Sequence, residues 1–364
     1  MGTLRTLLAT GVVIAHSDPI FGWRPLDGGA AVILFFVVSG FYMSLVLNRK
    51  YTGLTRAHWI FWQNRVLRLW PSYLVALVAM AAVRPDIVDT IFTDLSGASM
   101  PLAGLMNLFI IGAEWTQVVG LDSFGVVYFN SSNTTVNMGS YVLLGQNWAL
   151  ALEILFYIVA PFIVIRRSRV IVITALAVIG AGAIIHYDLS NFWRYRSFPG
   201  VLIFFMTGAV AYQLGTLVSE KTIATRTSSR IGGLSAALVI AAIAFPQTFM
   251  WFLPERHHMK LLIIIFVFGL PFWLQWSAGR SWDRWIGDLS YPVYLIHLPV
   301  VAVVGDHLSG HSRGITILLL SLALAAIMVL LIERPIDRIR QRRVRAGTPQ
   351  TQKSHLGHAV RDPV

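Results

Sequence analysis

The chain has 364 residues, of which 56% are hydrophobic and only 13% are charged, with a formal net charge of +12 and no cysteine. So little charge excludes a water-soluble surface. The lack of cysteine excludes disulfides, thiolate metal sites and an acyl-cysteine intermediate. The basic residues gather in alternate loops and near the C-terminus, which is typical of membrane topology rather than of nucleic-acid binding. The composition therefore predicts an all-α polytopic membrane protein.

Apolar runs of near-spanning length recur along the chain, separated by short polar connections, as expected of helices in a bilayer. They predict about ten transmembrane helices in one membrane domain, residues 1–335, followed by a basic, partly disordered cytoplasmic tail, residues 336–364. The predicted spans are residues 4–16, 30–47, 67–83, 141–165, 170–187, 198–218, 231–252, 259–276, 286–304 and 314–332. The first run lacks a small-residue cleavage site, so we expect a retained span rather than a signal peptide.

The loop charges predict the orientation of these spans. The loops on the side of both termini carry the excess of Lys and Arg, which predicts a plasma (inner) membrane protein with cytoplasmic N- and C-termini. Residues 102–111, "LAGLMNLFII", are too short to cross at about 1.5 Å per residue, so we expect a re-entrant or interfacial segment. The following "GVVYFNSSNTTVNMG" predicts a small outer hairpin around an Asn/Ser turn, serving either as a lid or as an ordinary loop.

Arg5 and His16 stand at the two ends of the first apolar run, with ten residues between them. Eleven steps along an α-helix turn through about 1100°, so the two side chains share one face about 16 Å apart. Each residue alone also fits a simpler role, Arg5 as a snorkelling anchor and His16 as an interfacial histidine. Together they indicate a cation near the cytoplasm and a proton acceptor deep in the membrane.

Two further motifs follow in the second and third spans. In "FFVVSGF", Ser39 and Gly40 favour close helix packing over a role for the Ser39 hydroxyl. In "RVLRLWPSY", Arg65 and Arg68 lie three residues apart and therefore on one side of a helix. Two guanidinium groups at that spacing suit phosphate, although they also fit a positive-inside anchor.

Charged and polar residues also occur in later spans. Glu153 lies inside an apolar span, where an unpaired carboxylate costs several kcal/mol, so it needs a partner or a pore. Tyr291, Tyr294 and His297 recur at threefold spacing in "SYPVYLIH", where a satisfied interior histidine is the favoured interpretation. Glu333 closes the last span, and the basic extension after it is typical of a membrane-surface helix near anionic lipid.

Taken in order, these motifs resemble the landmarks of the acyltransferase-3 family of integral membrane acyltransferases. The motifs are Arg5-x10-His16, "FFVVSGF", "RVLRLWPSY", "WALALEILFY", "SYPVYLIH" and the terminal "ERP". The resemblance implies a ten-span fold that uses cytoplasmic acyl-coenzyme A, usually acetyl-CoA, to O-acylate an acceptor at the far side of the membrane. Acceptors in the family are commonly surface or exported carbohydrates, so a carbohydrate or lipid-linked acceptor is expected.

The resemblance also implies roles for single residues. It makes His16 the catalytic histidine and Arg5 its partner in the first span, and it places Glu153 on the acidic position after the family's tryptophan. The expected donor-binding residues are Arg5, Ser39, Arg65 and Arg68. The second span lacks the acidic residue that often follows its glycine, and no extra-membrane hydrolase-like domain is expected, so transfer should finish within the membrane domain.

These residues predict a mechanism. Arginines at the cytoplasmic mouth hold phosphate while the thioester lies near His16, which acts as general base on an acceptor hydroxyl. Asp18 or Glu153 orients the imidazole, and a covalent acyl-histidine relay is the alternative. A proton-coupled transporter and a non-catalytic lipid-binding or scaffold protein stay open as other functions. We expect no metal ion and no nucleic-acid partner.

Overall fold

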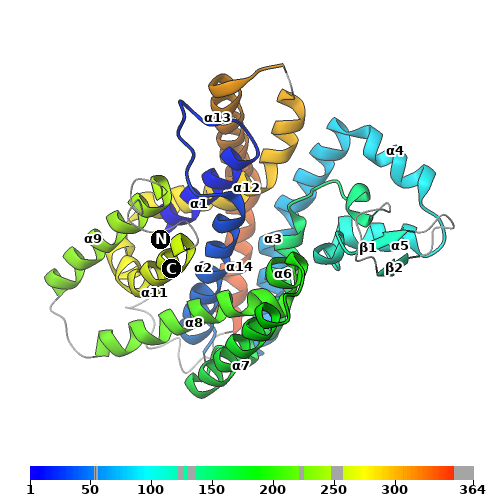
Figure 1. Ribbon diagram of the computed structural model, residues 1–364. Helices are drawn as coiled ribbons and strands as arrows, with labels where there is room; N and C mark the ends of the chain where they lie inside the picture. Colours follow the sequence, from blue (N-terminus) through cyan, green and yellow to red (C-terminus); the bar gives the residue numbers. More distant parts are fainter. Residues whose placement is uncertain are drawn as a thin grey trace.

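The structure is a computed structural model that describes residues 1–52, 54, 56–121, 127–129, 137–220, 225–246, 257–305 and 307–347. It is all-α apart from one small hairpin, and its helices pack side by side in a bundle (Figure 1). The α-helices are α1 Gly2–Ala15, α2 Gly28–Arg49, α3 Ala57–Val83, α4 Pro85–Asp94, α5 Ser99–Gly104, α6 Asn147–Ile163, α7 Arg167–His186, α8 Phe198–Glu220, α9 Thr225–Ala244, α11 His258–Ser277, α12 Ser281–Val304, α13 Gly310–Met328 and α14 Arg334–Gly347. Short π or 3-10 turns are η1 Leu105–Phe109, η2 Ala113–Trp115, η3 Met138–Tyr141, η4 Phe192–Arg196 and η6 Val329–Glu333.

Seven helices in the described part of the chain are long and apolar enough to cross a membrane. They lie in α2, α3, α7, α8, α11, α12 and the continuous helix Gly310–Ala346. The other three predicted spans overlap shorter apolar helices, Gly2–Ala15, Asn147–Ile163 and Gly232–Ala244. The span predicted at 231–252 runs past the end of α9 at Ala244, and its last residues, 247–252, lie outside the described residues. The membrane fold class is thus confirmed, whereas the count of ten stays a prediction. A fourth short helix, Ser99–Phe109, overlaps the run that we expected not to cross.

The span predicted at 141–165 begins too early. Helix α6 begins at Asn147, Tyr141 belongs to η3, and residues 142–146 between them follow an irregular path. The Asn107 side chain forms hydrogen bonds with the backbone at the start of this segment. Its amide nitrogen donates to the Tyr141 carbonyl at 2.8 Å, and its amide oxygen accepts from the Leu143 N–H at 2.9 Å. Apolar composition alone does not distinguish such a segment from a helical turn.

A hairpin is present near the predicted place. Strand β1, Val119–Leu121, pairs antiparallel with β2, Val127–Phe129, with Val119 opposite Phe129. Its first strand therefore precedes the predicted stretch. The expected Asn/Ser turn lies outside the described residues.

Helices α1 and α12 run parallel and pack closely along their length. The backbone N–H groups of Gly2 and Thr3 donate to the Asp283 carboxylate at 2.8 and 3.0 Å, which satisfies the start of α1 and its positive dipole end. A methyl group on Gly2 would collide with the Asp283 carbonyl, so only glycine allows this approach. At the other end of α1, the rings of His16 and His297 lie 5.1 Å apart. The pairing with α12 therefore fixes both ends of α1.

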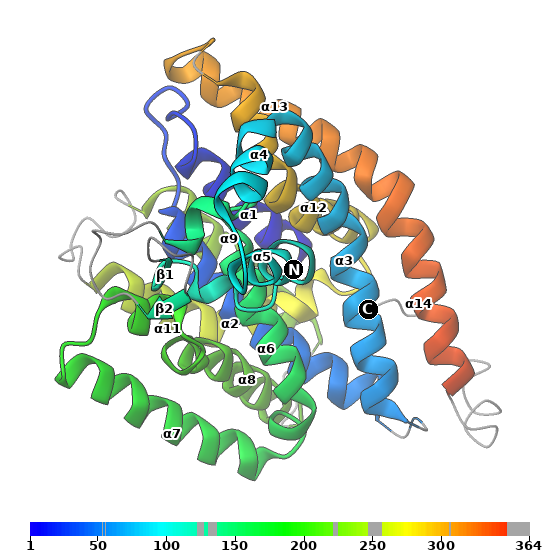
Figure 2. The same cartoon turned by 90° about the vertical axis from the view of Figure 1, so that its right-hand side faces the viewer.

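Helix α2 lies inside the bundle, against α1, α6, α8 and α11 (Figure 1). A methyl group on Gly40 would collide with the Phe205 backbone of α8. The ring pair Phe36–Phe205, with centroids 4.7 Å apart, packs next to this crossing. The close helix packing predicted from Ser39-Gly40 is therefore found at Gly40. Figure 2 shows α13 and α14 as one long helix along the edge of the bundle, with α3 beside it.

Candidate functional site

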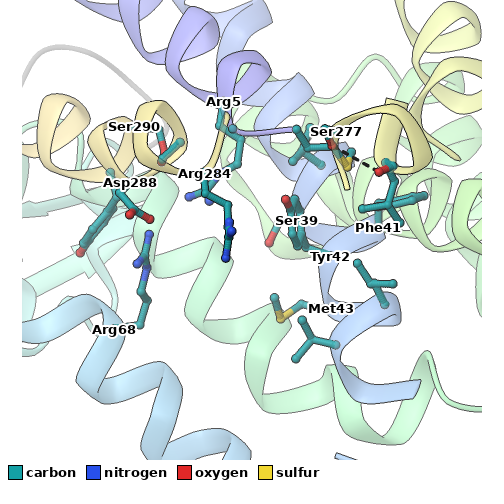
Figure 3. A pocket seen from close by; sticks show the side chains of 18 of the residues that line it. Arg5, Ser39, Phe41, Tyr42, Met43, Arg68, Ser277, Arg284, Asp288 and Ser290 are labelled. Atoms are coloured by element: carbon teal, nitrogen blue, oxygen red, sulfur yellow. Dashed lines mark hydrogen bonds between the residues drawn. The ribbon is translucent and has the colours of Figure 1, made fainter. Parts of the chain in front are cut away.

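The bundle contains a cavity of about 2010 Å³, larger than the roughly 300–1,000 Å³ of common ligand pockets. Its walls come from α1, α2, α3, α6, α8, α11, α12, η6 and α14. Figure 3 shows the side chains of Arg5, Arg68 and Arg284 reaching into it from three different helices. The basic lining residues are Arg5, Arg49, Lys50, Arg65, Arg68, Arg284, Arg334, Arg338, Arg340 and Arg345, and the acidic ones are Glu153, Asp283, Asp288, Glu333 and Asp337. The cavity is therefore strongly basic and suits an anion.

All four predicted donor-binding residues line this cavity, together with Glu153. The guanidinium of Arg65 lies over the rings of Phe61 and Tyr157, 5.3 and 5.5 Å from their centroids. The guanidinium of Arg5 lies 5.9 Å from the ring of Tyr42. The structure thus brings residues of the first, second, third and sixth helices into one space.

Glu153 has two hydroxyl partners. Its Oε1 atom accepts a hydrogen bond from Ser39 at 2.9 Å and from Tyr157, one turn later in α6, at 2.5 Å. The prediction that Glu153 needs a partner or a pore is confirmed, because it has hydroxyl donors and also faces the cavity. The Ser39 hydroxyl, for which packing was favoured, belongs to this polar group.

Arg68 is paired with Glu333, an ion pair that local sequence does not reveal. Its Nη1 lies 3.0 Å from Glu333 Oε2, and the Ser72 hydroxyl donates to the other carboxylate oxygen at 2.6 Å. The Arg68 and Glu333 side chains are 17% and 7% exposed. Figure 3 also shows the Asp288 carboxylate facing Arg68. Acidic groups therefore surround Arg68, in contrast to Arg65.

His16 lies at the end of α1 and outside the cavity. It is an exposed residue that caps α1, and it is not among the described residues that line the cavity. Its Nδ1 lies 2.9 Å from the Val12 carbonyl oxygen, which only accepts, so this geometry assigns the proton to Nδ1 and a lone pair to Nε2. Arg5 and His16 therefore lie at opposite ends of α1, as predicted, but only Arg5 reaches the cavity.

A row of aromatic rings connects the cavity wall with His16. Phe35 and Tyr294 both line the cavity, and their ring centroids lie 6.3 Å apart. Tyr294 lies 6.0 Å from His297, and His297 lies 5.1 Å from His16. The Tyr294 hydroxyl donates to the Gln146 carbonyl at 2.9 Å, which holds the ring in the wall.

His297 lies next to His16, a proximity that the sequence did not show. It is completely buried, and its Nδ1 lies 2.8 Å from the Tyr294 carbonyl, as expected of a satisfied interior histidine. Its Nε2, however, has no hydrogen-bond partner among the described residues. The three-residue spacing from Tyr294 was the available signal, but only the fold places His297 against His16.

The Asp18 carboxylate pairs with Arg313 rather than with His16. It lies 3.6 Å from the guanidinium of Arg313, which ties the loop after α1 to the start of α13. Within the described ranges, no hydrogen bond or ion pair joins either Asp18 or Glu153 to His16.

A metal site was not expected. The described ranges contain no group of three or more His, Cys, Asp or Glu residues placed to hold a metal ion.

Comparisons with known proteins identify the family of the chain. The profile of a family described as an acyltransferase domain, acyltransferase-3, matches residues 2–333. The chain belongs to the acyltransferase-3 family. It is 24% identical over 345 residues to the exopolysaccharide production protein ExoZ of Rhizobium meliloti, covering 92% of this chain and 98% of that protein. It is 21% identical over 365 residues to the O-acetyltransferase OatA of Staphylococcus aureus.

The coverage of the two relatives differs. The match to OatA covers 92% of this chain but 56% of OatA, so this chain spans about half of that protein. No solved structure matches the chain. Family membership, together with the seven long apolar helices, identifies an integral membrane acyltransferase.

Proposed function

We propose that the chain transfers an acyl group, acetyl by default, from cytoplasmic acyl-coenzyme A to a hydroxyl group at the far side of the membrane. The observation that carries this proposal is a basic cavity that ends at an aromatic wall, with the His16–His297 pair on the other side of that wall. Similarity to a protein named for exopolysaccharide production and to an O-acetyltransferase supports acetylation of a carbohydrate or lipid-linked acceptor.

The two ends of the site differ in chemistry. We name the end where α2 finishes, at Arg49 and Lys50, the arginine side, and the end where α1 finishes, at His16, the histidine side. Phosphates are bound well by guanidinium groups, so the nucleotide of the donor belongs at the arginine side. The excess of Lys and Arg in the inner loops supports a cytoplasmic position for this side.

Inside the cavity, the donor arm passes the Ser39–Glu153–Tyr157 group. These side chains are held by hydrogen bonds of 2.9 and 2.5 Å, so they present fixed polar atoms to the amides of a pantetheine arm. Beyond them stands the wall of Phe35 and Tyr294. The thioester has to pass this wall to meet a hydroxyl group on the histidine side.

His16 supplies the base in this proposal. Its Nε2 lone pair takes the proton of the acceptor hydroxyl while the hydroxyl oxygen attacks the thioester carbonyl. The carbon–sulfur bond then breaks, and the coenzyme A thiolate takes up the proton. We assign the positioning of the ring to the Val12 carbonyl, which is in hydrogen-bond distance of it, and to His297, whose ring lies against it. Among the described residues, no hydrogen bond or ion pair joins the ring to Asp18 or Glu153. An acyl-histidine relay would use the same nitrogen.

Release of coenzyme A from acetyl-CoA by the purified protein tests this function. Because the chain has no cysteine, a thiol-reactive dye added to the detergent solution reports only the coenzyme A thiol. We expect release above the rate with heat-inactivated protein, since an acyltransferase leaks acetyl groups to water, and acceleration by an acceptor alcohol. Folded protein that releases none, but drives proton-coupled uptake in vesicles, would contradict the proposal and indicate a transporter.

A further inference from the structure

Three cations from separate helices line the cavity at its arginine side. Lys50 caps α2, Arg65 lies in the first part of α3, and Arg340 lies in α14. Helix α14 packs against α3, so the basic extension after the last span joins the cavity wall. The expectation for this extension was a membrane-surface helix near lipid. Its place in the wall suggests a role in ligand binding.

Two of these cations have polar atoms without a partner. The Nε atoms of Arg65 and Arg340 are buried and have no hydrogen-bond partner among the described residues. The Arg340 side chain is 13% exposed, and its carboxylate partner Asp337, at 3.2 Å, is 44% exposed. Asp337 also accepts a hydrogen bond from Gln341 at 2.6 Å. A buried guanidinium nitrogen that lacks an acceptor is costly unless a ligand supplies one.

The cluster is also short of negative charge. Asp337 is the one carboxylate that forms an ion pair with any of its three members within the described residues. Burial, and after it the nearby Arg340 guanidinium, lower the pKa of Lys50, so a neighbouring cation adds to the cost of charging this amine. Arg68, by contrast, already has the buried Glu333 carboxylate at 3.0 Å. An arriving anion therefore gains more from Lys50, Arg65 and Arg340 than from Arg68.

We propose that Lys50, Arg65 and Arg340 form a phosphate-binding site for the nucleotide end of coenzyme A. The proposal rests on the proposed function, and it replaces Arg68 by Arg340 as the arginine that acts with Arg65. Coenzyme A carries a diphosphate and a 3′-phosphate on its nucleotide, and forked guanidinium groups bind such oxygens through paired hydrogen bonds. The headgroup of an anionic phospholipid offers the same chemistry, so the test has to separate these two sources.

The test compares Arg340→Gln with Arg342→Gln, a matched change in the same helix at an exposed residue that is not among the cavity-lining residues. Dissociation constants for coenzyme A, dephospho-coenzyme A and pantetheine are measured in detergent by calorimetry. We expect Arg340→Gln to weaken binding of coenzyme A by roughly tenfold or more, because a charge-assisted contact is lost. Binding of pantetheine should change by less than about twofold, and Arg342→Gln should bind all three ligands like the original chain.

Other results would overturn the proposal. These are an equal loss for coenzyme A and pantetheine, no loss for either, or a loss confined to binding of nanodiscs that contain phosphatidylglycerol. If Arg340→Gln does not fold, Arg340→Lys retains the charge but removes the fork, and it should weaken coenzyme A binding while sparing pantetheine.

Inorganic pyrophosphate separates this proposal from the proposed function. The first case is that pyrophosphate raises the thermal stability of the original chain but not of Arg340→Gln, while coenzyme A binds to neither protein. Acyl-coenzyme A would then not be the donor, and the phosphate site could not be assigned to coenzyme A, although the site would still bind an anion. Release of coenzyme A by an Arg340→Gln variant with unchanged affinity would overturn the phosphate site and leave the proposed function intact.

Discussion

Replacement of His16 by alanine is expected to lower the rate of acyl transfer by about 10²- to 10⁴-fold, because the general base is lost. Binding of acyl-coenzyme A should remain, since His16 does not line the cavity. His311→Ala is a matched control: His311 is an exposed histidine at the start of α13 whose ring stacks on Phe21 at 4.8 Å. The measurement is coenzyme A release at saturating acetyl-CoA, with binding measured in parallel.

His297 gives a second readout for the same mechanism. If it positions His16, His297→Gln should lower kcat and leave KM for acetyl-CoA nearly unchanged, because its ring contacts the base and not the cavity. Near-normal turnover of folded His16→Ala protein would refute the proposed base. A loss of donor binding in that variant would show instead that His16 belongs to the donor site.

Replacement of Glu333 by glutamine should lower the free energy of unfolding by about 3 kcal/mol, near the low end for a buried ion pair, because the largely buried Arg68 loses its hydrogen-bonded carboxylate and keeps only the facing Asp288 (Figure 3). The matched control is Asp86→Asn, which breaks the ion pair with Arg84 just beyond α3, where both side chains are well exposed. Such an exposed pair contributes about 0–1 kcal/mol. The measurement is the fraction of protein that stays folded in detergent as temperature rises.

The double variant Arg68→Met/Glu333→Leu separates the ion pair from other roles of Glu333. Both charges are removed together, so most of the lost stability should return. If Glu333→Gln is as stable as Asp86→Asn, or if the double variant is no more stable than the single one, the ion pair does not hold η6 against α3 in the way described.

The sequence predicts the helices well where hydropathy alone determines their position. Helix α2 at Gly28–Arg49 contains the predicted run 30–47, and helix α7 at Arg167–His186 contains all but the last residue of the predicted run 170–187, because lipid requires long apolar segments to satisfy their own backbone. The start of α6 was misplaced because the apolar residues before Asn147 bond to the Asn107 side chain. A side chain from a distant segment can replace a helical turn without changing hydropathy.

The residue types of the site follow from local motifs, but their pairings do not. Arg68 and Glu333 are separated by 265 residues, and only the packing of α3 against the end of the last long helix joins them. The spacing of Arg5 and His16 placed both on α1, but it did not show that an aromatic wall separates His16 from the cavity. Likewise, the basic extension that contains Arg340 is predicted from the sequence as a membrane-surface helix, because nothing in its local sequence shows that α14 packs against α3.

The central claim is that the acyl donor enters the cavity from the cytoplasm. The most direct test is to measure from which side of the membrane the protein uses acetyl-CoA. Inverted membrane vesicles expose the cytoplasmic face, and we predict that they release coenzyme A from added acetyl-CoA, whereas right-side-out vesicles do so only after permeabilisation. A single cysteine in place of the exposed Thr52, on the arginine side, reports the orientation of each preparation through an impermeant maleimide. Release by intact right-side-out vesicles, with none from inverted ones, would contradict a cytoplasmic donor that enters through the arginine-lined cavity.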